Sequence, residues 1–241
     1  MNIITILNLK GGVAKTTTAL NVAEALRTQN KKVLLIDLDY QKSLTILNNV
    51  NHKITALELL QEPNNIDLLE QALDDDIITA HEDLLTIDNL EPTRIKNILK
   101  QLNNKYDYVV IDNHCIFNTL VLNSLIASDT LIIPTTCNRL GYVGVDDMIN
   151  LLQLINKVYK KNLNSYLLIT DFRKCDLNIQ YKEILEELIK DKNIKLVNTI
   201  IRHSQPIEDS QALGQNLFTY SKRSNGSKDY LEATKEIFNL N

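Results

Sequence analysis

The residues with the clearest chemical signature lie near the start of the chain, in a segment that begins at Lys10 and ends at Thr17. In order they are Lys10, Gly11, Gly12, Val13, Ala14, Lys15, Thr16 and Thr17. The segment follows the apolar run Ile3–Leu9 and precedes apolar residues at helical spacing, which is the setting a phosphate-binding P-loop requires. Small residues let backbone N–H groups wrap around phosphate oxygens, and the helix N-terminus favours negative charge there. Lys15 can then neutralise the β- and γ-phosphates, and the Thr16 hydroxyl can bind Mg²⁺.

Three aspartates follow two other apolar runs of the chain. Asp37 and Asp39 come after Val33–Ile36, and Asp112 comes directly after Tyr108–Ile111. One aspartate after a strand is usually only a turn residue, but the carboxyl ends of parallel strands meet at one edge of a sheet. Three aspartates at the edge that carries a P-loop therefore indicate positioning of metal and water. The metal-binding residues predicted in this way are Thr16, Asp37, Asp39 and Asp112.

Apolar runs without alternation recur along the chain and are separated by helical patterns. Further strands are predicted at Thr130–Ile133, Tyr166–Ile169, Lys195–Ile201 and, more weakly, Leu84–Ile87. Helices are predicted at residues 19–26, 93–102, 119–127, 145–159, 181–189 and 230–238. Continuous apolar strands are typical of parallel sheets covered on both faces. The predicted fold is therefore an α/β, doubly wound, mostly parallel sheet with helices on both faces, forming a single domain over residues 1–241.

Composition excludes several classes of protein. Three cysteines, Cys115, Cys137 and Cys175, lie far apart, which suits a reducing compartment better than a disulfide framework. No stretch reaches the roughly 18 apolar residues of a membrane span, and the tail Ser227–Asn241 lacks the cationic bias of a membrane-surface helix. We therefore expect a cytoplasmic protein that does not bind membranes.

The charge of the chain is unevenly distributed. Residues 51–95 hold 2 Lys/Arg against 11 Asp/Glu, a net charge of −9, whereas the whole chain carries only −4. The remaining residues therefore have a net charge of +5, with 24 Lys/Arg against 19 Asp/Glu. This excess leaves room for a local nucleic-acid-binding patch.

The loop and the acidic strand ends together resemble the ParA/Soj/MinD family of deviant Walker A ATPases, and ParA-type partition ATPases most of all. The two lysines of the loop, Lys10 and Lys15, form the most specific part of the resemblance. The matching segments span nearly the whole chain. They are Lys10–Leu20, Val33–Gln41, Tyr106–Asp112 with Asn123–Pro134, and more loosely Thr199–Tyr220.

The resemblance implies an enzyme that hydrolyses ATP to ADP and phosphate slowly, with Mg²⁺. Two subunits would form a homodimer around two ATP molecules, and Lys10 would reach the phosphates of the partner's ATP as an arginine finger does. Asp39 would orient the attacking water with support from Asp37, so that Lys10, Lys15 and Asp39 form the implied catalytic set.

The resemblance also implies a cargo. The ATP dimer would bind DNA without sequence preference and associate with the nucleoid. A ParB-like or other centromere-binding protein would then stimulate hydrolysis, and the outcome would be plasmid or chromosome partition. The implied DNA-contacting residues are Arg202, Lys222, Arg223 and Lys228, although their spacing alone indicates only solvated side chains. The implied adenine contacts lie in Asp171–Arg173 and Arg202–Glu208, and within these segments at Asp171, Arg173 and Arg202.

Four departures from the family pattern affect the predicted site. Ala14 stands where the family has glycine and restricts φ beside the phosphates. Tyr40 replaces a proline after Asp39, and Asn113-His114 replace two prolines after Asp112. The segment Thr199–His203 also lacks a proline found near the adenine. We expect ATP binding to persist, because the lysines, Thr16 and the aspartates are all retained.

The same residues bear on three alternatives to a partition ATPase. The departures at Ala14 and Asn113-His114 favour a low-turnover, nucleotide-gated dimer that positions or regulates a non-DNA cargo, whereas Lys10 and Asp39 favour the partition ATPase. A P-loop kinase acting on a small molecule is disfavoured by the signature Lys10. A bridging iron–sulfur cluster would need a second cysteine before Cys115, and the sequence has none.

Overall fold

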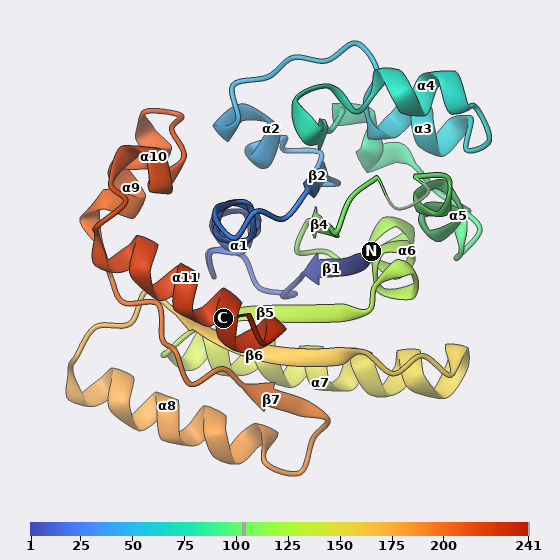
Figure 1. Ribbon diagram of the computed structural model, residues 1–241. Coiled ribbons are helices and arrows are strands. Elements are labelled where there is room, and N and C mark those ends of the chain that lie inside the picture. The colour runs from blue at the N-terminus through green and yellow to red at the C-terminus, as the bar shows by residue number, and fades with distance from the viewer. Residues whose placement is uncertain (103–104, 241) are drawn as a thin grey trace.

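The structure, a computed structural model, describes residues 1–102 and 105–240 of the chain. Asn241, the last residue of the predicted domain and of the tail Ser227–Asn241, lies outside these residues. In the described part, a parallel sheet of seven strands has the order β3-β2-β4-β1-β5-β6-β7 (Figure 1). The strands are β1 Asn2–Ile6, β2 Val33–Asp37, β3 Ile77–Ile78, β4 Tyr108–Asp112, β5 Thr130–Thr136, β6 Asn164–Thr170 and β7 Ile194–Leu196. The predicted fold class is confirmed.

Helices connect the strands and cover both faces of the sheet. They are α1 Lys15–Thr28, α2 Ser43–Leu47, α3 Ala56–Gln61, α4 Ile66–Gln71, α5 Arg94–Lys100, α6 Thr119–Ala127, α7 Arg139–Tyr159, α8 Asp176–Ile189, α9 Gln205–Ala212, α10 Leu217–Tyr220 and α11 Asn225–Phe238. Two short 3₁₀ helices, η1 Asp74–Asp76 and η2 Glu82–Thr86, flank β3. None of the helices in the described part of the chain combines the length and apolarity that a bilayer span needs.

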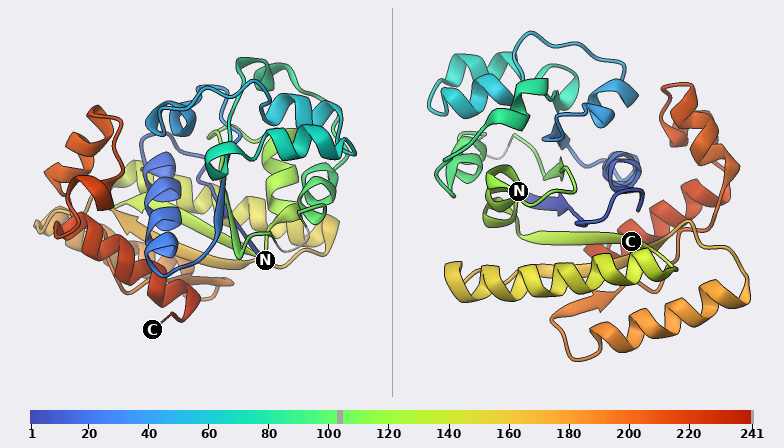
Figure 2. Two further views of the ribbon diagram at one scale, coloured as in Figure 1. Left: turned by 45° about the horizontal axis from the view of Figure 1, so that its top comes forward. Right: turned by 180° about the vertical axis from the view of Figure 1, so that it is seen from behind.

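The two faces of the sheet pack against different sets of helices. Val33 and Leu35 of β2 face one core, which α1 and α11 cover, whereas Leu34 and Ile36 face a second core under α3, α5 and α6. A third core lies between β5, β6, α7 and α8. Figure 2 shows α7 and α8 on the side of the sheet opposite to α1 and α11. Because both faces are buried, the strands need apolar residues at successive positions, which explains the runs in the sequence.

The first strand lies in the middle of the sheet. β1 pairs with β4, with Ile3 opposite Val109, and on its other side with β5, with Ile4 opposite Thr130. The P-loop leaves this central strand and enters α1 directly. The loop is therefore fixed at both ends by buried elements.

Two predicted strands differ from the structure. The strand predicted at Leu84–Ile87 is wrong: Leu84 is buried while Leu85 is 61% exposed, and residues through Thr86 form η2. The His81 side chain accepts a hydrogen bond from the Asp83 N–H (3.1 Å) and so starts this helical turn.

The strand predicted at Lys195–Ile201 is shorter than expected, because β7 ends at Leu196. Asn198 and Thr199 leave the ladder and donate their backbone N–H groups to the Glu236 carboxylate, at 2.6 Å and 3.0 Å. Further along, the Ile201 N–H donates to the Ile169 carbonyl of β6 at 2.9 Å.

Candidate active site at the carboxyl edge of the sheet

The carboxyl ends of β1, β2 and β4 border one cavity of about 580 Å³, here called the phosphate cavity. The P-loop residues Gly11, Gly12 and Ala14–Thr17 form one wall. The other lining residues that concern the chemistry are Asp39, Gln41, His114, Cys115 and Gln211. The structure thus brings most of the predicted P-loop together with Asp39, although these residues come from separate segments of the chain.

The P-loop backbone adopts the conformation that glycine favours at two positions. Gly12 has φ +76°, and Ala14 has φ 67° and ψ 36°, in the left-handed region. A Cβ is disfavoured in this region, which explains why the family pattern has glycine at the position of Ala14. The Ala14 carbonyl nevertheless accepts the Thr18 N–H at 2.9 Å, and the Lys15 ammonium donates to the Lys10 carbonyl at 3.1 Å. The alanine is therefore accommodated in a closed loop that begins a regular helix.

Asn8 and Gly144 hold the start of this loop, and the sequence analysis did not identify either. The buried Asn8 amide donates to the Pro134 carbonyl at 2.9 Å and accepts the Lys10 N–H at 2.9 Å. Gly144 of α7 lies so close that a Cβ there would stand 2.6 Å from Asn8 Oδ1 and 2.9 Å from Lys10 Cβ. The signature lysine is therefore positioned jointly by β5 and α7.

Asp112 is fully buried beneath the P-loop, and neither of its carboxylate oxygens has a hydrogen-bond partner that meets normal geometry among the described residues. Burial, followed by the nearby Asp37 charge, raises the pKa of Asp112 well above its usual range, while the Thr16 hydroxyl and Lys15 act in the opposite direction. An unpartnered buried carboxylate is costly unless a ligand compensates it.

Thr16 and Asp112 fit a Mg²⁺ ion that shares its coordination with phosphate oxygens and water. No group of three or more His, Cys, Asp or Glu side chains in residues 1–102 and 105–240 is arranged to hold a metal alone. Mg²⁺ in nucleotide sites usually takes one or two protein ligands and completes its shell with phosphates and water. The sparse donor set therefore agrees with a metal that enters together with a nucleotide.

Asp37 organises the loop that follows β2. Its Oδ1 accepts the Asp39 N–H at 3.0 Å, and its Oδ2 accepts both the N–H and the hydroxyl of Thr45 at 2.8 Å. Burial raises the pKa of Asp37 to about 6, although the hydrogen bonds from Thr45 and Asp39 lower it in part. Three contacts already occupy this carboxylate, so its predicted support of the Mg²⁺ shell stays a prediction.

Asp39 differs from Asp37 because it lines the phosphate cavity. Its Oδ1 accepts the Gln41 N–H at 2.9 Å, and its side chain is largely buried. Its neighbour Tyr40 packs its ring against His114, with the centroids 4.5 Å apart. The predicted water-orienting residue is thus fixed in a tight turn at the edge of the cavity.

Gln211 of α9 reaches the P-loop from the last quarter of the chain. Its amide donates to the Thr17 hydroxyl at 2.6 Å, across a separation of 194 residues. No local sequence signal identifies this glutamine, because nothing in the pattern around it differs from an ordinary solvated helix. It places α9 beside the phosphate cavity.

The residues predicted to contact adenine fall into two groups. His203 Nδ1 lies 2.7 Å from Asp171 Oδ1 and 3.2 Å from Arg173 Nη2, so these three side chains form one cluster. Arg202 lies next in the chain but points elsewhere, since its Nε and Nη2 donate to the Asp229 carboxylate at 2.9 Å and 2.6 Å. The structure brings Asp171 and Arg173 together and places the Arg202 guanidinium on α11 instead.

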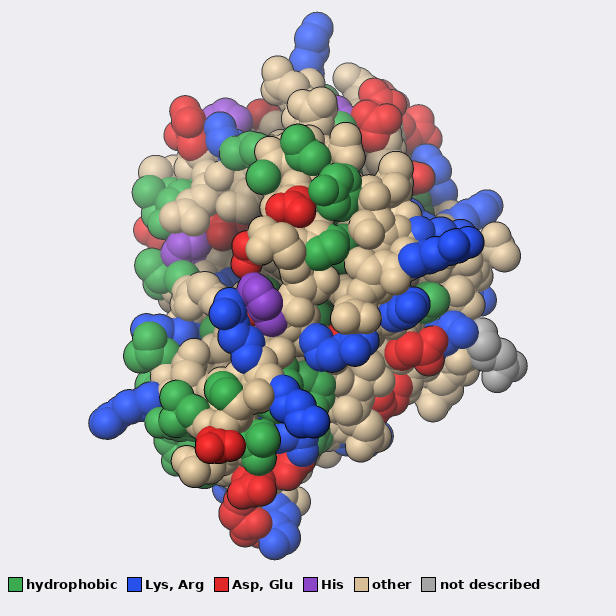
Figure 3. Space-filling model, turned by 90° about the vertical axis from the view of Figure 1, so that its left-hand side faces the viewer, with side chains coloured by type: hydrophobic (Ala, Val, Ile, Leu, Met, Phe, Trp, Pro, Cys, Tyr) green, Lys and Arg blue, Asp and Glu red, His purple; other side chains and the backbone are tan. Residues whose placement is uncertain are grey.

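The other predicted DNA-contacting residues lie around the start of α11. Lys222, Arg223 and Lys228 are exposed, and none of them forms an ion pair within the described residues. Figure 3 views the side of the molecule that carries α9 and α10 and shows Lys and Arg side chains across its middle. Arg202 differs from these three because Asp229 already neutralises its charge.

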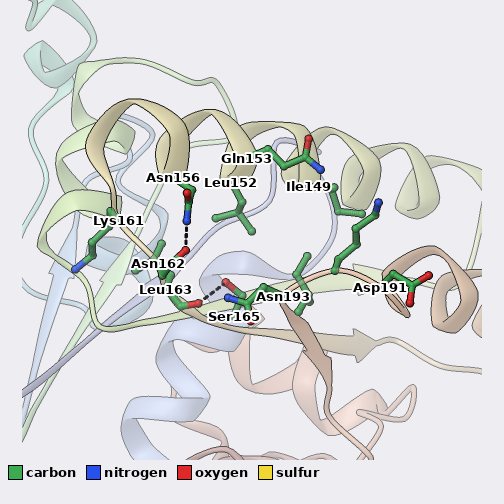
Figure 4. A pocket seen from close by; sticks show the side chains of 12 residues that line it. Ile149, Leu152, Gln153, Asn156, Lys161, Asn162, Leu163, Ser165, Asp191 and Asn193 are labelled. Carbon is green, nitrogen blue, oxygen red and sulfur yellow. Dashed lines mark hydrogen bonds between the residues drawn. The ribbon is translucent and has the colours of Figure 1, made fainter.

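A second cavity, of about 340 Å³, lies at the opposite edge of the sheet between α7, the start of β6 and the turn before β7 (Figure 4). Two of its polar side chains form hydrogen bonds: Asn156 donates to Asn162, and the Ser165 hydroxyl donates to the Leu163 backbone carbonyl at 3.2 Å. No side-chain nitrogen or oxygen lining it is both buried and unpartnered in the described structure. It therefore has no counterpart of the unpartnered Asp112 carboxylate that lies buried beneath the P-loop.

Comparison with known proteins agrees with this geometry. A family model described as "AAA domain" matches residues 1–165. The sporulation initiation inhibitor protein Soj of Bacillus subtilis (strain 168) is 30% identical, with 98% of this chain and 97% of that protein covered. A putative plasmid partition protein of Borrelia burgdorferi B31, solved with AMPPNP bound, is 29% identical over 98% of each chain, with a TM-score of 0.79.

A lower-identity neighbour supports the fold alone. The apo McdA structure from Cyanthece is 21% identical, covers 99% of each chain and has a TM-score of 0.83. Together with the lysines, the buried aspartate and the sheet order, the family match over residues 1–165 and the full-length similarity to Soj decide the classification. The chain belongs to the ParA/Soj/MinD family of P-loop ATPases.

Proposed function

We propose that residues 1–241 form a single ParA-type ATPase domain that binds Mg-ATP, dimerises around two nucleotides and binds DNA without sequence preference. A ParB-like or other centromere-binding partner would stimulate hydrolysis, and the cycle would drive plasmid or chromosome partition. The observation that carries this proposal is the buried, unpartnered Asp112 carboxylate beneath a P-loop with two lysines.

The P-loop, the aspartates at the strand ends and the residues that hold Lys10 have separate roles in the proposed reaction. The P-loop N–H groups and Lys15 would bind the phosphates, while Thr16 and Asp112 would hold Mg²⁺, which neutralises phosphate charge when bound. Asp39 would accept a hydrogen bond from the attacking water and orient it toward the γ-phosphate. Lys10 would act on the ATP of the second subunit, and Asn8 and Gly144 would position it.

Two observations support DNA as the cargo. Lys222, Arg223 and Lys228 are exposed cations in a chain whose remainder outside residues 51–95 has an excess of positive charge. Among the relatives, the Borrelia burgdorferi structure carries the name of a putative plasmid partition protein, and a 26% identical protein of Myxococcus xanthus is a chromosome partitioning protein ParA. Exposed lysines and arginines bind phosphate backbones irrespective of sequence.

The second candidate function is a low-turnover dimer that positions or regulates a non-DNA cargo. Tyr40 and His114 favour it, because they lie in the two loops after β2 and β4 that border the cavity and both depart from the family pattern. The fold does not select between the two functions, since a septum site-determining protein of Pyrococcus horikoshii shares it with a TM-score of 0.80 at 20% identity.

Fluorescence anisotropy of a non-specific duplex, titrated with protein at low salt, tests the proposal. We expect binding with Mg-ATP and little binding with Mg-ADP. Turnover measured with and without DNA then distinguishes the two functions, because only the partition ATPase should be accelerated by DNA or a partner. Binding in neither nucleotide state, with nucleotide bound normally, would contradict DNA as the cargo and favour the second function.

A further inference from the structure

Two loops border the phosphate cavity on the side away from the P-loop. The first, residues 39–42, follows β2 and carries Asp39; the second, residues 113–117, follows β4 and comes directly after Asp112. The proposed hydrolysis requires the groups on these loops to keep a fixed separation, since a misplacement of about 1 Å can lower a rate roughly 100-fold. What joins the loops is therefore of functional interest.

Backbone hydrogen bonds connect the β2 and β4 segments only as far as the ends of the two strands. Asp37 lies opposite Asp112 in the ladder, and the Leu38 N–H donates to the Asp112 carbonyl at 3.0 Å. Beyond Leu38, no backbone hydrogen bond connects the two loops in the described residues. Any further mechanical connection must come from side chains.

Tyr40 and His114 provide that connection and are called the ring pair below. Their ring centroids are 4.5 Å apart with an interplanar angle of 38°, a tilted contact within the range of favourable aromatic packing. His114 is only 6% exposed, and Tyr40 packs against the core beneath α3 and α5. The ring pair therefore continues the connection between β2 and β4 past the end of the sheet.

Hydrogen bonds close both of the loops that carry the rings, and one of them holds the His114 imidazole itself. The Ile116 N–H donates to His114 Nδ1 at 3.1 Å, which fixes the imidazole plane across the turn of the second loop. Asn113, just before it, accepts the Ser124 hydroxyl at 2.6 Å and so ties the loop to α6. On the other side, the Gln41 and Lys42 N–H groups both donate to Asp39 and close the turn that carries Tyr40.

We propose that Tyr40 and His114 are positioning residues: their ring contact couples the loop of Asp39 to the loop after Asp112, so that the two respond as one unit to the γ-phosphate. This inference rests on the proposed ATPase function. The ring pair would stiffen the two loops on which the proposed reaction places the γ-phosphate. Its loss affects hydrolysis and the discrimination between ATP and ADP, while the P-loop retains its affinity for ADP.

A double-mutant cycle on the full chain tests the coupling. We expect Tyr40→Ala and His114→Ala each to lower kcat at least 10-fold with the affinity for Mg-ADP changed less than 2-fold. The double variant should be no slower than the slower single variant, because either change removes the same contact. Tyr40→Phe keeps the ring and should retain kcat within 2-fold.

A matched control removes another ring contact far from the cavity. Phe238 of α11 packs on Tyr108 at the amino end of β4, with centroids 5.2 Å apart. Phe238→Ala should lower the melting temperature and leave kcat unchanged. Independent, multiplicative effects of the two ring-pair substitutions would overturn the proposal, as would a parallel loss of ADP affinity or a Tyr40→Phe variant as slow as Tyr40→Ala.

Proton NMR of the wild-type histidines provides a readout that requires neither turnover nor an unstable variant. The chain has four histidines, and the His114 signal can be assigned with His114→Gln. We expect this signal to shift with Mg-ATPγS and to stay in place with Mg-ADP, and Tyr40→Phe to preserve the difference. Equal shifts with both nucleotides, or none, would overturn the coupling. Absence of turnover in a protein that still shows the γ-phosphate-dependent shift would contradict the ATPase function and leave the ring pair supported.

Discussion

Asp112 combines complete burial with two carboxylate oxygens that lack normal hydrogen-bond partners in the described structure. Such a group destabilises the protein without ligands, since Thr16 and Lys15 offset the cost of burial only in part, and a cation bound beside it compensates the charge. The pKa of Asp112 is raised for the same reason, first by burial and then by the nearby Asp37 charge. Asp112 therefore lowers the stability of the nucleotide-free protein and favours the binding of Mg²⁺.

Replacing Asp112 with asparagine should separate these two effects. We expect Asp112→Asn to raise the free energy of unfolding of the nucleotide-free protein by about 1–3 kcal/mol, because the amide has no charge to desolvate. The same change should weaken the Mg²⁺-dependent part of ATP affinity at least 10-fold. Thermal melts with and without nucleotide and Mg²⁺ measure both quantities.

Asp88→Asn is the matched control, since Asp88 is exposed and should change neither stability nor affinity measurably. A destabilised Asp112→Asn protein without nucleotide would show that the carboxylate has a structural partner.

Ala14 tests how much the left-handed backbone costs. An L-residue there loses about 1–2 kcal/mol, while glycine loses roughly 0.5–1 kcal/mol of chain entropy on folding. We therefore expect Ala14→Gly to stabilise the protein by about 0.5 kcal/mol and to change ATP affinity less than 10-fold. Calorimetric titration of both proteins measures this. Failure of the wild type to bind ATP at millimolar concentration, restored by glycine, would refute our expectation that Ala14 is tolerated.

At the scale of elements, the P-loop depends on helices that are distant in the sequence. Gly144 of α7 lies against Asn8 and Lys10, and a Cβ there would come within 2.6 Å of Asn8 Oδ1. We expect Gly144→Ala to displace the start of the loop and to weaken ATP binding about 10-fold. Its effect on stability should be smaller than the 1–3 kcal/mol typical of overpacking, because alanine favours the helix by about 1 kcal/mol.

Leu154→Ala on the same helix is the control for this change, because Leu154 is 51% exposed and lies far from the loop. Equilibrium dialysis with labelled ATP compares the two variants. Normal affinity in Gly144→Ala would mean that α7 tolerates the extra methyl group and does not position Lys10.

The C-terminal helix α11 is tied to the segment after β7 by one carboxylate. Burial raises the pKa of Glu236, but four hydrogen bonds from Asn198 and Thr199 outweigh it and lower the pKa below its usual value. A depressed folded-state pKa adds stability above the unfolded pKa, and this stability is lost as pH falls through the folded pKa.

Glu236→Gln should therefore destabilise the protein by on the order of 1 kcal/mol at pH 7, and the difference from wild type should shrink below about pH 4. Urea unfolding at several pH values measures this. A difference that stays constant down to pH 3 would mean that the charge of Glu236 is irrelevant to the contact.

The elements also show where prediction from sequence succeeds. Strands such as the one over Tyr108–Ile111 could be predicted, because burial on both faces requires an uninterrupted run of apolar residues. β3 escaped notice because it has only two residues, Ile77 and Ile78, and the neighbouring Leu84 is equally apolar but lies in a 3₁₀ turn. Short segments take their conformation from tertiary contacts, which a local pattern does not contain.

The same limit applies to the candidate site. The P-loop and the aspartates could be predicted because their chemistry requires fixed residue types at fixed spacing. Gln211 could not, since its contact with Thr17 spans 194 residues. The ion pair between Arg202 and Asp229 could not be predicted either, because nothing in the sequence around either residue distinguishes it from an ordinary surface residue.

At the scale of the whole molecule, charge is divided between two regions. Residues 51–95, which include α3, α4, η1, β3 and η2, carry a net charge of −9 and would repel DNA. Residues Lys222, Arg223 and Lys228 are exposed at the start of α11. In the proposed function, DNA should therefore lie over α11 and away from the acidic segment.

Arg223→Glu should weaken ATP-dependent binding to all duplex sequences alike and reduce the slope of log affinity against log salt by about 1 or more. Lys100→Glu is the matched control, because Lys100 is an exposed lysine on α5. Anisotropy titrations at several salt concentrations provide both slopes. An unchanged slope for Arg223→Glu would remove Arg223 from the interface.

The central place of β1 has a consequence for the synthesis of the chain. Ile3 pairs with Val109, which is synthesised 106 residues after it. At about 5–20 residues per second, the first strand waits on the order of 5–20 s for its neighbour. During that time an apolar segment and the unformed P-loop behind it have no sheet to join. The nascent protein can acquire its nucleotide only after β4 has been made, so ATP binding would report that the central half of the sheet has closed.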